Sequence, residues 1–163
     1  FCDTDVVGTD GTLGGKYRGA AALADVIAAS WGAGGDDRYV VLTGGEPMLQ
    51  VDAALIEALH ERGFTIAIET NGTLAVPRSI DWICVSPKAG SDLVQMSGDE
   101  LKLVWPQAGS DIDRLASLDF THRLVQPLDD AQTAANVQQC IDLVMADPRW
   151  RLSLQTHKNL GLR

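Results

Sequence analysis

The chain has 163 residues, 45% of them hydrophobic and 21% charged, which suits one globular domain with a core of its own. Its formal net charge is −9 and its basic residues are scattered, so a nucleic acid would be repelled and a small-molecule ligand is expected. No apolar run approaches the ~18 residues of a membrane-spanning helix, so we expect no membrane partner. We therefore expect a single domain over residues 1–163.

The cysteines are odd in number and none has a close neighbour, being Cys2, Cys84 and Cys140. A disulfide framework is therefore not expected, and a reducing, cytoplasmic location fits best. Cys84 lies in an apolar run and Cys140 in a helical pattern, which predicts that both are small core residues. Cys2 differs because polar residues follow it.

Along the chain, a polar, glycine-rich loop over residues 1–19 is followed by alternating helical and apolar segments. Helical spacing of apolar residues predicts helices over 20–30, 52–61, 111–118 and 133–145. Short apolar runs predict strands over 39–42, 65–68, 82–85, 101–104, 123–125 and 151–154. Strands that alternate with helices indicate an α/β fold, with a parallel sheet and right-handed crossovers.

Polar residues follow most of the predicted strands. They are Thr43–Pro47 (TGGEP), Glu69–Gly72 (ETNG), Ser86–Lys88 (SPK), Gln126 and Gln155–Lys158 (QTHK), while Lys102 lies inside the fourth strand. In a βα barrel, or part of one, the carboxyl ends of the strands share one face, where such folds place their chemistry. We expect these residues to gather there.

The first two motifs each admit two interpretations. Gly44 and Gly45 would let backbone approach a ligand closely, with Glu46 accepting from an ammonium group. Alternatively, the motif is a strand-to-helix turn with Glu46 near a helix start, where a carboxylate is favoured. Glu69 and Asn71 suit ribose hydroxyls, although Asn-Gly is also a common tight turn.

The basic residues are less specific. Lys88 and Lys102 could bind a carboxylate, yet lysines are usually solvated. His157 follows the last predicted strand and is a candidate for a functional role, whereas His60 and His122 are expected to be structural. No His/Cys/Asp group has the spacing of a metal site.

Taken together, the motifs resemble the 7-carboxy-7-deazaguanine synthases of the radical S-adenosylmethionine superfamily. The segments that carry the resemblance are 1–5 (FCDTD), 43–48 (TGGEPM), 68–72 (IETNG), 82–88 (WICVSPK) and 151–158 (RLSLQTHK). The resemblance implies a partial (β/α) TIM-like barrel with parallel strands, of the radical S-adenosylmethionine type.

The same resemblance implies a [4Fe-4S] cluster, S-adenosyl-L-methionine and Mg²⁺ as cofactors. Cys2 matches the third cysteine of the cluster, and a thiolate is the ligand that such iron takes. Thr4 matches a residue on the magnesium ion, and Asp3 is a weaker candidate for it.

Further residues match ligand contacts of the family. The cofactor-binding set is Gly44, Gly45, Glu46, Glu69, Asn71, Ser86, Lys88 and Gln126, and the substrate-binding set is Thr43, Gln155, His157 and Arg163. No side chain acts as a catalytic group, because the cofactor carries the radical that rearranges 6-carboxy-5,6,7,8-tetrahydropterin to 7-carboxy-7-deazaguanine and ammonia. An electron donor such as flavodoxin and a homodimer are further expectations.

The chain also departs from the family pattern. The first two cluster cysteines and the first strand are expected upstream of Phe1, so we expect an N-terminally truncated chain that is inactive as given. Two alternatives stay open: a glycyl-radical-activating enzyme, and a non-catalytic module that binds S-adenosylmethionine or a nucleotide.

Overall fold

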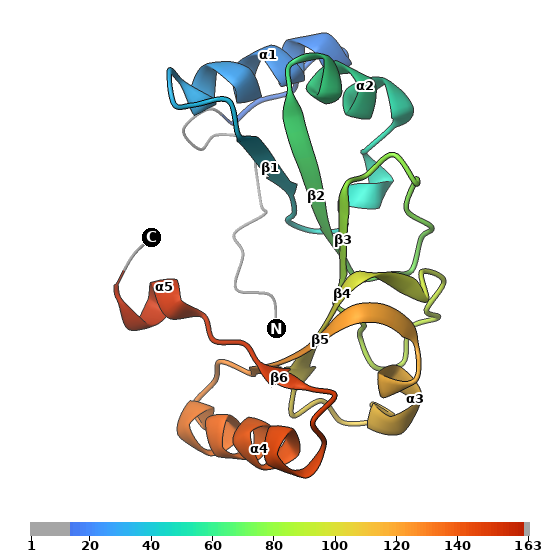
Figure 1. Ribbon diagram of the computed structural model, residues 1–163, viewed down its shortest axis with the longest axis vertical. Coiled ribbons are helices and arrows are strands. Elements are labelled where there is room, and N and C mark those ends of the chain that lie inside the picture. The colour runs from blue at the N-terminus through green and yellow to red at the C-terminus, as the bar shows by residue number, and fades with distance from the viewer. Residues whose placement is uncertain (1–13, 162–163) are drawn as a thin grey trace. The chain divides into compact units, whose positions relative to one another are not determined.

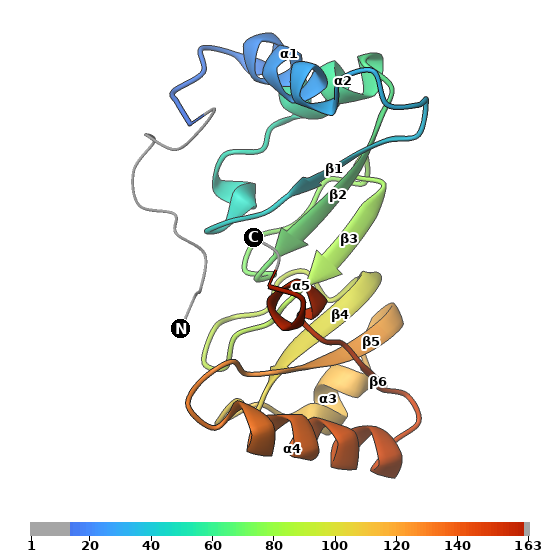
Figure 2. The ribbon, with the colours of Figure 1, turned by 90° about the vertical axis from the view of Figure 1, so that its left-hand side faces the viewer.

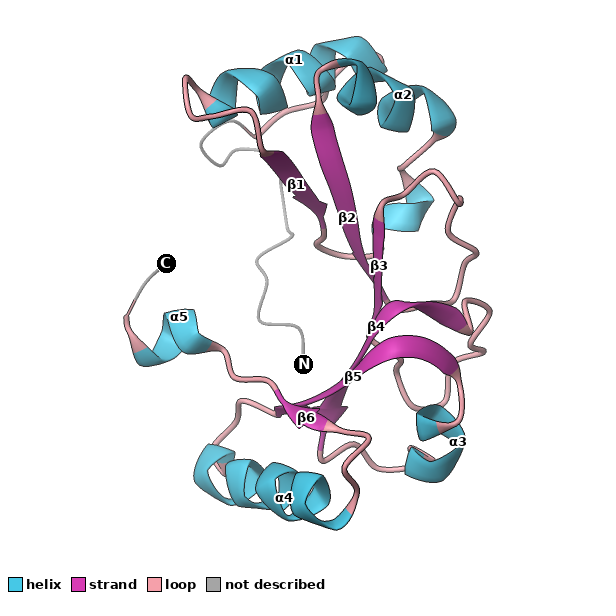
Figure 3. Ribbon diagram, in the orientation of Figure 1, coloured by secondary structure: helices cyan, strands magenta, loops and turns pink. Residues whose placement is uncertain are grey.

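The computed structural model describes residues 14–161 and places six parallel strands in one sheet, in the order β1-β2-β3-β4-β5-β6 (Figure 1). The strands are β1 (Arg38–Leu42), β2 (Phe64–Thr70), β3 (Trp82–Val85), β4 (Ser97–Trp105), β5 (Asp119–Pro127) and β6 (Arg151–Leu152). The helices are α1 (Ala20–Trp31), the 3-10 helix η1 (Pro47–Leu49), α2 (Ala53–Glu61), α3 (Ile112–Ala116), α4 (Thr133–Ala146) and α5 (Thr156–Asn159) (Figure 3). The sequence prediction of a parallel α/β fold is confirmed.

The described chain forms two compact units. The first comprises the residues up to Thr70 together with Ala75–Ile83, and the second comprises Asn71–Leu74 and the residues from Cys84 onward. The expectation of a single domain stays a prediction. None of the helices in the described part of the chain combines the length and apolar character needed to cross a membrane.

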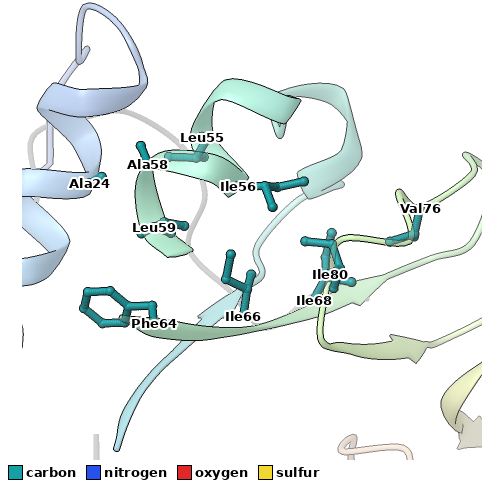
Figure 4. Close-up of a cluster of buried hydrophobic side chains, with 10 residues drawn as sticks. All are labelled: Ala24, Leu55, Ile56, Ala58, Leu59, Phe64, Ile66, Ile68, Val76 and Ile80. Atoms are coloured by element: carbon teal, nitrogen blue, oxygen red, sulfur yellow. The ribbon is translucent and has the colours of Figure 1, made fainter. Parts of the chain in front are cut away.

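In the first unit, α1 and α2 lie side by side, and their apolar residues pack with those of β2 (Figures 1 and 2). Ile66 and Ile68 of β2 are fully buried, and Figure 4 shows Ile66 on the side of α2 and Ile68 beside Ile80. Helix α2 begins where the carboxylate of Asp52 accepts a hydrogen bond from the Leu55 amide at 2.9 Å. Its apolar residues recur at helical spacing, so one face of the helix is buried in this core.

A carboxylate ties α2 to the strand that it covers. Asp81 Oδ2 accepts hydrogen bonds from the Ile66 amide at 2.8 Å and from His60 Nε2 at 2.9 Å. Partial burial acts to raise the pKa of Asp81, but these two hydrogen bonds and the charge of His60 outweigh it and lower the pKa. The ionised carboxylate of Asp81 therefore stabilises the folded state.

In the second unit, β4 and β5 pair along nearly their whole length, from Ser97 opposite Asp119 to Trp105 opposite Pro127. Helix α4 lies beside β5 and β6 (Figures 1 and 2). The core of this unit contains the fully buried Leu101, Leu103, Val125 and Cys140.

Helix α3 is fixed at both ends by polar side chains. Asp111 accepts from the Arg114 amide at 3.0 Å at the start of the helix. At its end, the guanidinium group of Arg123 in β5 donates to the carbonyls of Ala116 at 2.8 Å and Leu118 at 2.7 Å. These bonds satisfy backbone groups that a helix end leaves without partners.

All six predicted strands and all four predicted helices are present; β3 has the predicted ends, and the others differ at one end or both. Strands β4 and β5 begin several residues before the apolar runs that predicted them, because their first residues are mostly polar, with the buried Phe120 as an exception. Residues 153 and 154, predicted as strand, lie beyond the end of β6. The short helices η1 and α5 were not predicted. Cys84 and Cys140 are buried, as expected.

Replacing Leu59 with alanine should lower the free energy of unfolding by about 2–5 kcal/mol, because the side chain is 0% exposed and its loss leaves a cavity. Urea denaturation followed by circular dichroism measures the change. Leu49→Ala is the matched control, since Leu49 is 75% exposed and its truncation should cost within about 0.5 kcal/mol. Equal losses in the two variants would contradict the assignment of the core.

Asp81→Asn should reduce the dependence of stability on pH at acid pH. The pKa of Asp81 is lowered in the folded state, so its stabilisation is present above the ordinary aspartate pKa of 3.8 and is lost as pH falls through the folded pKa. Urea denaturation at a series of pH values from neutral to acid would show this loss in the parent chain and a flatter profile in the variant. The control is Asp37→Asn, at an exposed position. Parallel profiles for the parent chain and Asp81→Asn would refute the role of this carboxylate.

Candidate functional site

At the carboxyl ends of β1 and β2, two predicted site residues lie level with each other. The register pairs Leu42 with Ile68, so Thr43 and Glu69 come next on adjacent strands. Thr43 Oγ1 donates to Glu69 Oε2 at 3.5 Å, a long hydrogen bond. The pairing therefore brings the expected substrate contact Thr43 beside the expected cofactor contact Glu69.

Glu46 caps the 3-10 helix that follows β1. Its Oε1 atom accepts from the Met48 amide at 3.0 Å and from the hydroxyl of Thr70 at 2.7 Å. Thr70, at the end of β2, is only 2% exposed. The interpretation of Glu46 as a residue at a helix start is thus confirmed, and its binding to an ammonium group stays a prediction.

Gly44 and Gly45 precede this carboxylate with φ angles of 89° and 60°. Residues that carry a Cβ atom rarely adopt positive φ angles, which explains why glycine is favoured at both positions. No heavy atom lies within 4 Å of a Cβ built on Gly45, so this position faces open space. A ligand could approach the backbone of the turn from this side.

The second motif forms a tight turn after β2. Asn71 Oδ1 accepts from the Thr73 amide at 2.9 Å. Gly72 has a φ angle of 77°, and a Cβ there would lie 2.6 Å from Leu93 and 2.7 Å from Val85. The carbonyl of Gly72 also accepts from the amides of Val94 and Gln95. The turn interpretation is therefore confirmed, and ribose binding by Glu69 and Asn71 stays a prediction.

Lys88 is held at the end of β3 and is not a freely solvated lysine. Its ammonium group donates to both the carbonyl oxygen and the hydroxyl of Ser86, each at 2.8 Å. Next to it is a hollow of about 100 Å³ whose lining includes Lys88, Ser91 and Arg114. The expected pair of cofactor contacts, Ser86 and Lys88, thus forms one hydrogen-bonded group.

One face of β4 and β5 carries several polar side chains. The register pairs Glu100 with His122 and Lys102 with Leu124, and Gln126 follows on the same face of β5. Lys102 therefore lies in the middle of its strand. His122 and Glu100 were not predicted as site residues. The alternation of buried apolar residues with polar ones along β4 and β5 is the sequence signal that places them on the same face as Lys102 and Gln126.

The last predicted site residues follow β6. Gln155 is partly buried and immediately precedes α5, and His157 is exposed within that helix. Lys158 Nζ lies 2.5 Å from Asp129 Oδ2 in the loop after β5. The motif at the end of the chain is thus tied to the start of α4 by a pair of charges that the sequence did not single out.

Four expected site residues lie outside the described part of the chain, namely Cys2, Asp3, Thr4 and Arg163. Within residues 14–161, no group of three or more His, Cys, Asp or Glu residues could hold a metal ion. Burial raises the pKa of the Cys140 thiol to about 11, so it stays protonated at neutral pH. A thiolate is the form that binds metal, so Cys140 is a poor substitute for a cluster ligand.

The chain is similar in sequence to 7-carboxy-7-deazaguanine synthases. It is 60% identical to the enzyme of Bradyrhizobium diazoefficiens over 163 residues, which covers 100% of this chain and 78% of the relative. It is 57% identical to that of Bordetella pertussis, covering 99% of this chain and 77% of the relative. It is 33% identical to that of Escherichia coli K12, covering 88% and 70%. No protein-family model matches the chain.

A solved structure is similar in fold. The crystal structure of QueE from Escherichia coli superimposes with a TM-score of 0.65 and 28% sequence identity, covering 83% of this chain and 63% of that chain. The chain thus spans less than two thirds of this structural relative, although it spans more than three quarters of the two bacterial enzymes with the higher identities given above.

Thr70→Val should lower the free energy of unfolding by about 1–3 kcal/mol, because it removes a buried hydroxyl that donates to a carboxylate. Thr65→Val is the control, since Thr65 is exposed on the same strand and the change is chemically identical. Urea denaturation of both variants gives the comparison. A loss no larger in Thr70→Val than in Thr65→Val would show that the hydroxyl does not hold Glu46.

Proposed function

The chain belongs to the 7-carboxy-7-deazaguanine synthase family, and from this premise we propose that its polar strand ends bind S-adenosylmethionine and a reduced pterin. The observation that carries the proposal is 60% identity to a 7-carboxy-7-deazaguanine synthase over the whole of this chain. The proposed reaction is the radical ring contraction of 6-carboxy-5,6,7,8-tetrahydropterin to 7-carboxy-7-deazaguanine and ammonia, as catalysed by a carbon–nitrogen lyase.

The turn after β1 would hold the methionyl end of S-adenosylmethionine. Glu46 presents a carboxylate whose orientation is fixed by the Thr70 hydroxyl and the Met48 amide. The positive φ angles of Gly44 and Gly45 turn the backbone of this loop, and the space beside Gly45 is open. A primary ammonium group needs acceptors in just such a place, so these residues fit the amino group of the cofactor.

The remaining cofactor contacts would come from three other segments. Glu69 and Asn71 would accept from and donate to the ribose hydroxyls. Ser86, Lys88 and Gln126 would bind further polar atoms of the cofactor, and the ammonium group of Lys88 is already oriented by Ser86. Such preorganised groups lose little conformational entropy when the ligand binds.

Substrate would be bound by Thr43, Gln155, His157 and Arg163. The amide and imidazole groups suit the many ring nitrogens and the carboxylate of a pterin, because they donate and accept hydrogen bonds. The charge of −9 is compatible with this small ligand and unfavourable for a nucleic acid.

The metal ligands of the proposal are Cys2 for a [4Fe-4S] cluster, with Thr4 and, more weakly, Asp3 for Mg²⁺. Of the described thiols, Cys84 and Cys140 are both buried, and the raised pKa of Cys140 makes it unsuitable. When bound, the cluster and S-adenosylmethionine supply the radical chemistry, while this chain's residues bind, orient and shield the substrate.

Partners and location follow from the same chemistry. The reaction needs an external electron, so a reduced protein such as flavodoxin is the proposed donor, and a homodimer is the proposed assembly. The free thiols of Cys84 and Cys140 in the described part of the chain, together with the proposed iron–sulfur site, favour a reducing, cytoplasmic setting.

Glu46→Gln should weaken the binding of S-adenosylmethionine by about ten- to a hundredfold, because it removes a charge-assisted hydrogen bond. The glutamine keeps an oxygen that can accept from Thr70 and Met48, so the fold should be retained. Anaerobic calorimetry measures the dissociation constant, and Glu57→Gln, an exposed change in α2, is the control. Equal dissociation constants for the two variants would refute the role of Glu46.

The proposed reaction is tested by anaerobic incubation with 6-carboxytetrahydropterin, S-adenosylmethionine and a reductant. The protein is expressed with whatever upstream residues its gene encodes, and its cluster is reconstituted before the assay. Chromatography should detect 7-carboxy-7-deazaguanine and released ammonia. Cofactor cleavage without consumption of the pterin would point to a different substrate, such as the protein substrate of a glycyl-radical-activating enzyme.

A further inference from the structure

The segment that carries Gln155 and His157 has little regular structure of its own. It follows β6, which is two residues long, and the last backbone bond to the sheet runs from the Ser153 amide to the Val125 carbonyl at 2.9 Å. Helix α5 has four residues, too few to be stable in isolation. The position of these side chains must therefore depend on contacts with the rest of the second unit.

The contact that stands out is between Lys158 and Asp129. Lys158 Nζ lies 2.5 Å from Asp129 Oδ2, and the two side chains are 33% and 46% exposed. The pair joins α5 to the loop between β5 and α4. It lies at a hollow of about 80 Å³ whose lining also includes Gln155 and Leu154. In the sequence, Lys158 is thus adjacent to one proposed substrate contact, His157, and three positions after the other, Gln155.

The loop that carries Asp129 is itself firmly held. Asn136 of α4 is 2% exposed, and its amide group donates to the Leu128 carbonyl at 2.8 Å and to Asp130 Oδ1 at 2.9 Å. These bonds fix the residues on both sides of Asp129. The hydroxyl of Thr133 lies 2.6 Å from the Asp130 carbonyl and 3.1 Å from Asp129 Oδ1, so it adds a further link between α4 and this loop. Asp129 therefore projects from a loop whose neighbouring residues are held by α4, and Lys158 contacts it from the short helix α5.

We propose that the Asp129–Lys158 ion pair positions the segment 155–158, so that Gln155 and His157 are held where the pterin binds. Lys158 and Asp129 are positioning residues. They act on the substrate only by holding Gln155 and His157 in place, and they need not touch it. This inference rests on the proposed function, because it presumes that Gln155 and His157 contact the substrate.

The test compares Asp129→Asn, Lys158→Met, the double variant and the charge swap D129K/K158D. Two quantities are measured: the dissociation constant of the reduced pterin by anaerobic calorimetry, and the rate of chymotryptic cleavage after Leu154. Each single variant should bind the pterin about three- to fivefold more weakly and be cleaved faster by a similar factor, as expected for a partly exposed ion pair. High salt should shrink both differences, because it screens charges of this exposure.

The remaining variants separate positioning from general damage. The double variant should be no weaker than either single variant, and the charge swap should recover most of the affinity. Arg149→Met is the matched control, since it removes a cation from the Asp147 ion pair in the same unit and should leave both quantities unchanged. Affinity for S-adenosylmethionine should be the same in every variant.

Three results would count against the proposals in different ways. Unchanged cleavage in Asp129→Asn and Lys158→Met would overturn the ion pair as a positioning element. Faster cleavage with unchanged pterin affinity would overturn its link to substrate binding. If Gln155→Ala and His157→Ala bind the pterin as tightly as the parent chain, the proposed substrate contacts themselves fail, whatever the ion-pair variants show.

Discussion

Parallel pairing in a fixed register is the constraint on which the candidate site depends. In the first unit, the register that pairs Leu42 with Ile68 also places Thr43 beside Glu69. A slip of one residue would turn the buried Ile66 and Ile68 to the other face of β2, so the apolar core enforces the register. The polar residues at the strand ends are therefore positioned by the packing of buried apolar residues on the same strands.

The same logic holds in the second unit with different residues. Leu101 and Leu103 of β4 and Val125 of β5 are fully buried, and the alternate positions carry Lys102, His122 and Gln126. Because side chains alternate along a strand, burying one set presents the other set on the opposite face. The alternation of side chains between the two faces of β4 and β5 thus determines both the packing of the core and the placement of the polar residues.

The sequence predicted the strands and longer helices because their signals are local, namely apolar runs and the helical spacing of apolar residues. It also predicted that polar residues lie near the carboxyl ends of the strands, although β2 and β5 extend through Glu69 and Gln126 and β6 ends before Gln155. The binding roles of these residues stay a prediction. The bond from Thr70 to Glu46 and the contact between Asp129 and Lys158 could not be predicted in this way. Both join segments more than twenty positions apart, and nothing in the local pattern of either residue indicates its partner.

Several candidate ligand-binding groups already serve the fold, and this double use affects how they would bind. Glu46 caps η1, Asn71 closes a turn, and Lys88 is bonded to Ser86. A side chain that is fixed before the ligand arrives has already lost its rotational freedom, so less entropy is lost on binding. The cost is that each group can offer only the hydrogen-bonding capacity that its structural bonds leave. A carboxylate such as that of Glu46 has two oxygens and several lone pairs, so it can accept structural hydrogen bonds and still accept from a ligand. The ammonium group of Lys88 has three donors, and two of them already bond Ser86. Glu46 is accordingly the stronger point from which to test the site.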